Sequence, residues 1–161
     1  NQPVLPVRFR HPLGWEVQEE SGKIERYQQI RVRGPRNAED TYTCYMTVRL
    51  QLLGGSGGKF ATVDERIQHY LAQLYKDPQV LADATFTVAG VRARTLTVGQ
   101  TIPPLAQPGL KARAIPVTTR TVFLARPPYL YELVYSADTR EYDRHVRVFE
   151  RLLKTFRFLS S

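Results

Sequence analysis

The chain of 161 residues contains few of the side chains from which disulfides and metal centres are built. Its single cysteine, Cys44, excludes an internal disulfide and a thiol-rich zinc site. The three histidines, His11, His69 and His145, lack the i, i+4 spacing of a helical metal site, so we expect no metal and no cofactor. No run of 18 apolar residues is present, so we expect no transmembrane segment in this chain.

The overall composition is that of an ordinary globular protein. Hydrophobic residues make up 42% of the chain and charged residues 24%, which excludes the disordered class. A chain of this length buries about two-thirds of its unfolded surface on folding, so it needs no covalent staple. We therefore expect residues 1–161 to form a single domain.

The formal net charge is +8, and the excess is concentrated toward the C-terminus. Residues 103–161 carry ten Lys and Arg against five Asp and Glu, a local balance of +5. Such a positive field favours anionic partners, which include acidic protein surfaces, lipid headgroups and phosphate backbones. A role in solubility alone would give the same composition.

The clearest local pattern is a strict alternation over residues 41–53. Cys44, Met46, Val48 and Leu50 fall on one face of this segment, which predicts a long strand that is covered on at least one side. Shorter segments rich in β-branched and aromatic residues predict further strands. These strands lie at residues 7–10, 15–19, 24–33, 85–89, 91–98, 117–125 and 129–136.

Two segments have the period of an amphipathic helix instead. Residues 62–76 begin with a capping box, Thr62 followed by Glu65, and carry an apolar stripe opposite a polar face that includes Arg66 and His69. Residues 138–157 carry a second stripe around Phe149. Strands, a helix, more strands and a helix follow one another, so the order predicts an antiparallel α+β arrangement with each helix lying on the sheet.

Several short segments stand in an order that resembles one superfamily. The chain opens with FRHPLGW at residues 9–15 and continues with the capped helix and VAGVRA at residues 88–93. It ends with YELVYSA at residues 131–137 and FERLLKTF at residues 149–156. Together these segments resemble the PsbP/Mog superfamily. The resemblance implies an α/β/α sandwich, with a central antiparallel sheet and helices packed on both faces.

The resemblance also implies a class of function. The superfamily includes extrinsic subunits of photosystem II, a Ran-binding nuclear-import factor, bacterial envelope lipoproteins and chaperones for secreted effectors. We therefore expect a non-catalytic protein-binding or assembly module, exported or associated with the envelope of a bacterium. Its place would be extracytoplasmic, in the periplasm, in the cell envelope or secreted, and a segment ahead of Asn1 could carry a lipid anchor.

Two groups of basic side chains are the candidate binding residues, and we expect them to meet a protein partner with an acidic surface. The groups are Arg31, Arg33 and Arg36, and then Lys111, Arg113 and Arg120. The second group lies beside a proline-rich segment, residues 103–116, and long loops on a rigid scaffold commonly carry binding functions. The arginines at positions 140, 144, 147 and 151 are interspersed with acidic residues, so a solvated helix face is expected there.

Three other functions stay open. A surface that binds nucleic acid or anionic lipid predicts that the basic groups merge on one face, and we favour nucleic acid less than protein. A chaperone for a secreted effector follows from the resemblance. An enzyme with an unrecognised site would need an acid, a base and a nucleophile in one cleft.

Three local features invite a functional interpretation that the residues do not support. The glycine-rich residues 54–59 are not a Walker A loop, because Leu53 stands where a glycine is required and Phe60 where Ser or Thr is required. We expect a flexible connection there. Cys44 is expected to be a small buried hydrophobe and Trp15 a part of the core.

Overall fold

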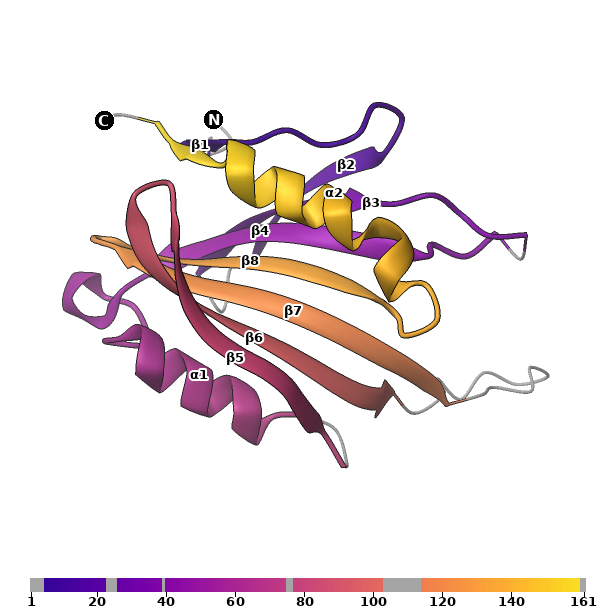
Figure 1. Cartoon of the computed structure of the whole chain (residues 1–161). Coiled ribbons are helices and arrows are strands. Elements are labelled where there is room, and N and C mark those ends of the chain that lie inside the picture. The colour runs from indigo at the N-terminus through magenta and orange to yellow at the C-terminus, as the bar shows by residue number, and fades with distance from the viewer. Residues whose placement is uncertain (1–4, 23–25, 39, 75–76, 103–113, 160–161) are drawn as a thin grey trace.

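The centre of the molecule is a seven-stranded sheet in which every neighbouring pair of strands is antiparallel (Figure 1). The computed structural model describes residues 5–22, 26–38, 40–74, 77–102 and 114–159. The strand order is β2-β3-β4-β8-β7-β6-β5, and β1 and β9 form a separate two-stranded sheet. The elements are β1 (Val7–Arg8), β2 (Glu16–Gly22), β3 (Tyr27–Arg33), β4 (Cys44–Leu52), the 3₁₀ turn η1 (Gly54–Ser56), α1 (Val63–Ala72), β5 (Gln79–Val88), β6 (Val91–Ile102), β7 (Ile115–Arg126), β8 (Tyr129–Asp138), α2 (Tyr142–Thr155) and β9 (Arg157–Phe158).

The strand β4 lies inside the sheet, between β3 and β8. The side chains that alternate along it, Cys44, Met46, Val48 and Leu50, are each exposed by 4% or less. The next residue on the other face, Tyr45, is 39% exposed. The alternation in the sequence therefore identified both the strand and its core-facing side.

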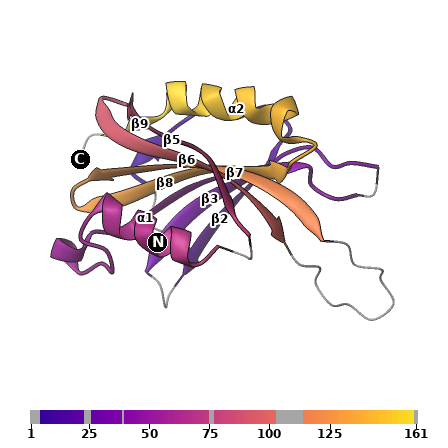
Figure 2. The same ribbon diagram turned by 60° about the horizontal axis from the view of Figure 1, so that its bottom comes forward.

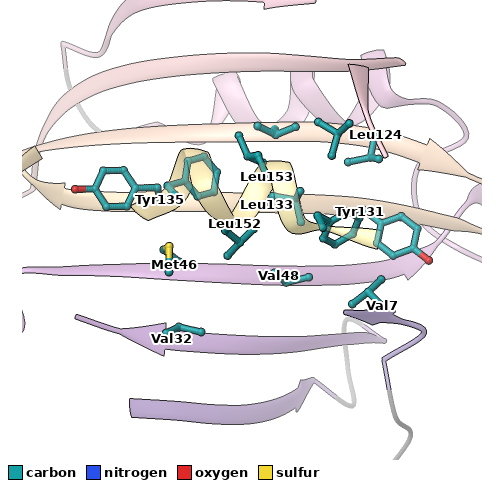
Figure 3. Close-up of a cluster of buried hydrophobic side chains, with 14 of the residues drawn as sticks. Val7, Val32, Met46, Val48, Leu124, Tyr131, Leu133, Tyr135, Leu152 and Leu153 are labelled. Carbon is teal, nitrogen blue, oxygen red and sulfur yellow. The ribbon is translucent and has the colours of Figure 1, made fainter. Parts of the chain in front are cut away.

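The helix α2 covers one face of the sheet and closes the main core. Phe149, Leu152 and Leu153 are buried, and they pack on the alternate residues of β4, β7 and β8 that face them (Figure 3). The ring of Tyr135 stacks on Phe149 with centroids 5.8 Å apart, and its hydroxyl donates to the backbone oxygen of Tyr142 at 2.8 Å. This packing follows from the apolar stripe that the sequence predicted.

The helix α1 lies on the opposite face of the sheet (Figure 2). The backbone N–H of Glu65 donates to Oγ1 of Thr62 at 3.1 Å, which confirms the predicted N-terminal cap. Ile67 is buried against Leu96 and Phe123. Because α1 has ten residues and packs mainly on β6 and β7, it leaves the β3 and β4 part of this face without a covering helix; there Tyr45 is exposed, whereas Thr47 and Gln51 are buried by neighbouring side chains.

The antiparallel sheet with two helices confirms the predicted α+β class, but several boundaries were wrong. The helix expected at residues 138–157 begins later, because β8 continues to Asp138 and α2 starts at Tyr142. The strand expected at residues 85–89 is the end of the longer β5. Most of β5 is exposed on both faces at the edge of the sheet. It therefore lacks the alternation of apolar and polar residues that identifies a half-buried strand.

Two short strands from the N-terminal and C-terminal parts of the chain pair in the separate small sheet. Val7 pairs with Phe158 and Arg8 pairs with Arg157. The sequence predicted a strand near residue 7 but assigned Arg157 to the last helix, because a two-residue strand has no period of its own. Within the described residues, neither helix has the length and apolar composition needed to cross a bilayer.

Candidate functional site

The first predicted group of basic residues lies along β3 and just after it, on the face that α1 leaves open. Arg31 and Arg33 alternate with core-facing residues of β3, so their side chains leave the sheet on the other side. The guanidinium carbon of Arg31 lies 5.4 Å from the ring centre of Tyr45, and that of Arg33 lies 5.2 Å from the ring centre of Tyr42. We call Arg31, Arg33 and Arg36 the β3 arginine patch.

Acidic side chains neutralise part of the β3 arginine patch. Arg36 donates to Asp40 at 2.9 Å, and this hydrogen bond raises the pKa of the arginine above its ordinary value. Arg31 lies 3.9 Å from a carboxylate oxygen of Glu20. Arg33 makes no ion pair with any residue that the structure describes. The patch therefore presents Arg33 and the exposed ring of Tyr45 as its most available groups.

Arg120, from the second predicted group, does not join this patch. Arg120 lies on the α2 side of the sheet, where its Nε donates to Oγ1 of Thr95 at 3.2 Å and its guanidinium lies 5.8 Å from the ring centre of Phe149. Lys111 and Arg113 lie outside the described residues. Arg120, the one member of the second group with a described position, is thus on the opposite face of the sheet from Arg31 and Arg33.

A third basic cluster, which the sequence did not single out, surrounds a cavity of about 540 Å³. The cavity lies between α1, the turn before it and the open face of β4. Its ionisable lining residues are Arg26, Arg49, Lys59, Arg66 and His69, and no acidic side chain is among the described lining residues. We call this cavity the α1 pocket.

Strand pairing brings the residues of the α1 pocket together. Tyr27 pairs with Gln51, so the neighbouring Arg26 and the nearby Arg49 come to the same end of the β3–β4 pair. The guanidinium of Arg49 lies 3.7 Å from the ring centre of Tyr27. The only signal in the sequence was Lys59, which directly follows a run of glycines.

The glycine-rich segment, which the sequence predicted to be a flexible connection, forms a hydrogen-bonded turn. The N–H of Gly54 donates to the backbone oxygen of Phe60 at 2.7 Å, and that of Gly58 donates to the backbone oxygen of Leu53 at 2.9 Å. These bonds occupy the amides inside the turn, so the segment does not form the row of free N–H groups that cradles a phosphate in a P-loop. It holds Lys59 at the rim of the α1 pocket instead.

The close packing of this turn gives a testable prediction for Gly58→Ala. A Cβ at position 58 would lie 1.6 Å from the backbone oxygen of Leu52, so the turn would have to rearrange. We expect the free energy of unfolding to fall by about 2–3 kcal/mol, at the upper end of ordinary point mutants, in urea denaturation. Gly55→Ala is the matched control, because a Cβ there meets nothing within 4 Å, and we expect a change of about 0.5 kcal/mol or less. Equal losses in the two variants would contradict this account of the turn.

A buried ion pair forms the floor of the α1 pocket. Arg66 donates through Nη2 to Oε1 of Glu132 at 2.8 Å and through Nε to Oε2 at 3.1 Å. The side chains of Arg66 and Glu132 are 13% and 5% exposed, and Gln51 donates to the same carboxylate at 3.3 Å. The sequence placed Arg66 on the polar face of the helix, and the structure shows that this part of the face is turned toward the sheet. Glu132 neutralises Arg66, so the remaining charge of the pocket belongs to its rim.

His69 lies against Lys59 at this rim. Nζ of Lys59 is 3.2 Å from Nε2 of His69, so the ammonium donates to an unprotonated ring nitrogen. The other ring nitrogen, Nδ1, is buried and has no hydrogen-bond partner among the described residues. Burial lowers the pKa of His69 below its ordinary value, and the charges of Lys59 and Arg66 lower it further. His69 is therefore neutral at neutral pH.

This arrangement predicts that Lys59→Gln raises the pKa of His69. The substitution removes a positive charge that opposes protonation of the ring, while the effect of burial stays. An NMR titration of the ring protons measures the pKa directly. Lys154→Gln removes the same charge at the C-terminal end of α2 and should leave the titration of His69 unchanged. A pKa that stays constant in Lys59→Gln would contradict the contact.

The α1 pocket offers positive charge and hydrogen-bond donors. Its described lining contains no serine, threonine, cysteine or carboxylate that could act as a nucleophile. Cys44 is buried in the main core, and burial raises the pKa of its thiol to about 11, so it stays protonated at neutral pH. Within the described ranges, no three His, Cys, Asp or Glu side chains are grouped so that they could hold a metal ion.

Comparison with known proteins shows which solved structures share this architecture. The sequence matches no protein-family model and no curated protein. Among solved structures, LpqN of Mycobacterium tuberculosis, which is involved in cell envelope biogenesis, superposes with a TM-score of 0.55 at 13% identity over 96% of this chain and 83% of LpqN. The cyanobacterial PsbP protein, CyanoP, of Synechocystis sp. PCC 6803 superposes with a TM-score of 0.53 at 14% identity over 95% of this chain and 86% of CyanoP. The chain has a PsbP-like fold.

A third structure extends the comparison. PA94 of Pseudomonas aeruginosa, a protein of unknown function, superposes on the PsbP-like fold of this chain with a TM-score of 0.53 at 10% identity, over 83% of this chain and 91% of PA94. The resemblance of the sequence segments to the PsbP/Mog superfamily is thus confirmed at the level of the fold. At identities of 10% to 14%, the likeness concerns the fold alone.

Proposed function

We propose that this chain is a non-catalytic protein-binding or assembly module that works in an extracytoplasmic compartment of a bacterium. The observation that carries the proposal is the β3 arginine patch, which lies on the half of a sheet face that α1 leaves open. The involvement of LpqN in cell envelope biogenesis supports the compartment. A lipid anchor ahead of Asn1 would hold such a module at a membrane surface.

We further propose a domain organisation and a layer architecture for the chain. We assign residues 1–161 to one domain and classify it as an α/β/α sandwich. The sheet that continues from β2 to β5 supports the first assignment, and the placement of α1 and α2 on opposite faces supports the second.

The chemistry of the β3 arginine patch favours an acidic protein partner. Arg33 makes no ion pair with a described residue, and Tyr45 is 39% exposed beside Arg31. Arginine and tyrosine are enriched among the residues that contribute most to protein interfaces, because they combine apolar area with hydrogen-bond donors. Carboxylates of a partner would pair with the guanidinium groups while apolar atoms cover the rings.

The test is affinity capture from an envelope extract of the cells that make the protein. The variant Arg31→Glu/Arg33→Glu reverses two charges of the patch, and Arg144→Glu/Arg147→Glu reverses two charges on the exposed side of α2 as the matched control. We expect the wild type and the control to capture the same partner, and the patch variant to lose about tenfold or more of it. Lys111→Glu/Arg113→Glu tests the second predicted group in the same assay.

Two outcomes would overturn the proposal. If the patch variant and the variant of the second group both capture the partner as well as the wild type does, the basic groups are not the binding surface. If the α2 control loses as much as the patch variant, the interaction depends on net charge alone.

A further inference from the structure

The α1 pocket combines size and positive charge at one place on the molecule. Its volume of about 540 Å³ lies within the usual range of roughly 300–1,000 Å³ for small-molecule sites. Arg26, Arg49 and Lys59 line it together with Arg66, which Glu132 neutralises. Arg26 and Lys59 make no ion pair with any residue of described position. Both side chains are exposed at the mouth of one cavity, and an anion bound there would offset the repulsion between their like charges.

Another basic hollow, formed by described residues, differs from this pocket. It has a volume of about 380 Å³ and is lined by Arg8, Arg10, Lys154 and Arg157 beside the end of α2. There Nη1 of Arg157 donates to the backbone oxygens of Lys154 and Phe156 at 2.9 and 2.6 Å, so this guanidinium caps the helix. The hollow therefore uses part of its charge for the fold, and it serves as an internal control.

We propose that the α1 pocket binds a phosphate group, which is carried by a soluble compound or by a lipid headgroup. This inference goes beyond the protein-binding role, because the lining of the pocket shares no residue with the β3 arginine patch. Guanidinium and ammonium groups are the side chains that proteins use most for phosphate, since they supply charge-assisted N–H donors. The occupied amides of the glycine-rich turn leave these side chains as the ligands.

The other walls of the pocket define what the phosphate is attached to. Phe60 and Leu52 line the pocket together with the cations, and the charged groups of Lys59 and Arg66 each lie 5.4 Å from the ring centre of Phe60. Such a wall accommodates an apolar or ring-shaped part beside the anion. The volume exceeds the space that a lone phosphate ion fills, so an organic body or a second phosphate fits next to the first.

The binding test uses two probes and the full chain. Inorganic pyrophosphate is titrated by calorimetry at two salt concentrations, and binding to phosphatidylcholine vesicles with and without phosphatidylglycerol is measured by co-sedimentation. We expect one of the two probes to bind, and more weakly at the higher salt concentration. Saturable binding of pyrophosphate alone identifies a soluble phosphate compound, and binding only to the phosphatidylglycerol vesicles identifies a headgroup.

Two double variants show whether the pocket is the site. Arg26→Gln/Lys59→Gln removes one arginine and one lysine from the rim, and Arg10→Gln/Lys154→Gln removes the same pair from the second hollow. All four side chains are exposed, so both variants should fold. We expect the first variant to weaken the affinity about tenfold or more, and the control about twofold or less.

The NMR resonances of two histidines show where on the molecule the probe binds. On addition of pyrophosphate or of the soluble phosphatidylglycerol headgroup, the ring resonances of His69 should shift, while those of His145, which packs against Trp15 on the other side of the sheet, should not. The proposal is overturned if neither probe binds the wild type, if the control variant loses as much affinity as the rim variant, or if His145 responds and His69 does not. None of these results depends on the partner of the β3 arginine patch, so the two proposals fail separately.

Discussion

Arg66→Met is expected to lower the free energy of unfolding by about 3–5 kcal/mol, one of the two largest effects that we predict for this molecule. Arg66 and Glu132 share two charge-assisted hydrogen bonds, at 2.8 and 3.1 Å, beneath α1. Methionine keeps much of the length of the side chain but leaves the Glu132 carboxylate, which is 5% exposed, without its cation. Gln51, at 3.3 Å, supplies one neutral donor and cannot replace two charged ones.

The double variant Arg66→Met/Glu132→Leu is the decisive comparison. It removes both charges together, so no carboxylate is left buried, and apolar pairs of similar size commonly match buried ion pairs in stability. We expect it to recover most of the loss seen in Arg66→Met, measured by urea denaturation monitored by circular dichroism. A loss below about 1 kcal/mol for Arg66→Met, or a double variant no better than the single one, would show that water reaches the carboxylate and solvates it.

The features that the sequence predicted well are those that neighbours in the chain determine. The hydrogen bond from Glu65 to Thr62 spans three residues, so a capping box in the sequence is enough to place the start of α1. The alternation of apolar and polar residues along β4 is equally local, because it depends only on which side of this one strand faces the core. The edge strand β5 is solvated on both sides over most of its length, so its sequence carries no such record.

The α1 pocket could not be predicted, because its residues come together only through strand pairing and the packing of α1. Arg49 is on β4 and Arg26 is just before β3, and the pairing of Tyr27 with Gln51 is what joins them. Nothing in the sequence states this register. The burial of Arg66 was missed for a related reason. A charged residue on the polar side of a helix is expected to face solvent, and only the fold shows that Arg66 pairs with a buried carboxylate on β8.

The positions of the predicted binding residues illustrate the same limit. Arg31, Arg33 and Arg120 all lie on strands, and the parity of each residue along its own strand is visible in the sequence. Which parity faces α2 depends on the pairing of that strand with its neighbours. Arg120 is paired with Tyr135 and shares the α2 side, whereas Arg31 is paired with Thr47 and shares the open side. A basic composition therefore did not translate into one basic face.

Phe149→Ala is the second large prediction, with an expected loss of about 3–5 kcal/mol in the free energy of unfolding. Phe149 is fully buried and stacks on Tyr135 at the centre of the contact between α2 and the sheet. The substitution removes the apolar contact and leaves a cavity, because the strands on the other side are held by their hydrogen bonds and cannot close it. It also removes the ring over which Arg120 lies at 5.8 Å.

Urea denaturation of Phe149→Ala and Arg147→Ala measures this effect on one helix. Arg147 is two residues away and exposed, so its replacement changes the helix without changing the core, and we expect a shift of about 0.5 kcal/mol or less. A loss in Phe149→Ala no greater than that in Arg147→Ala would mean that α2 contributes little to the core, and the packing of this helix on β4, β7 and β8 would then be wrong.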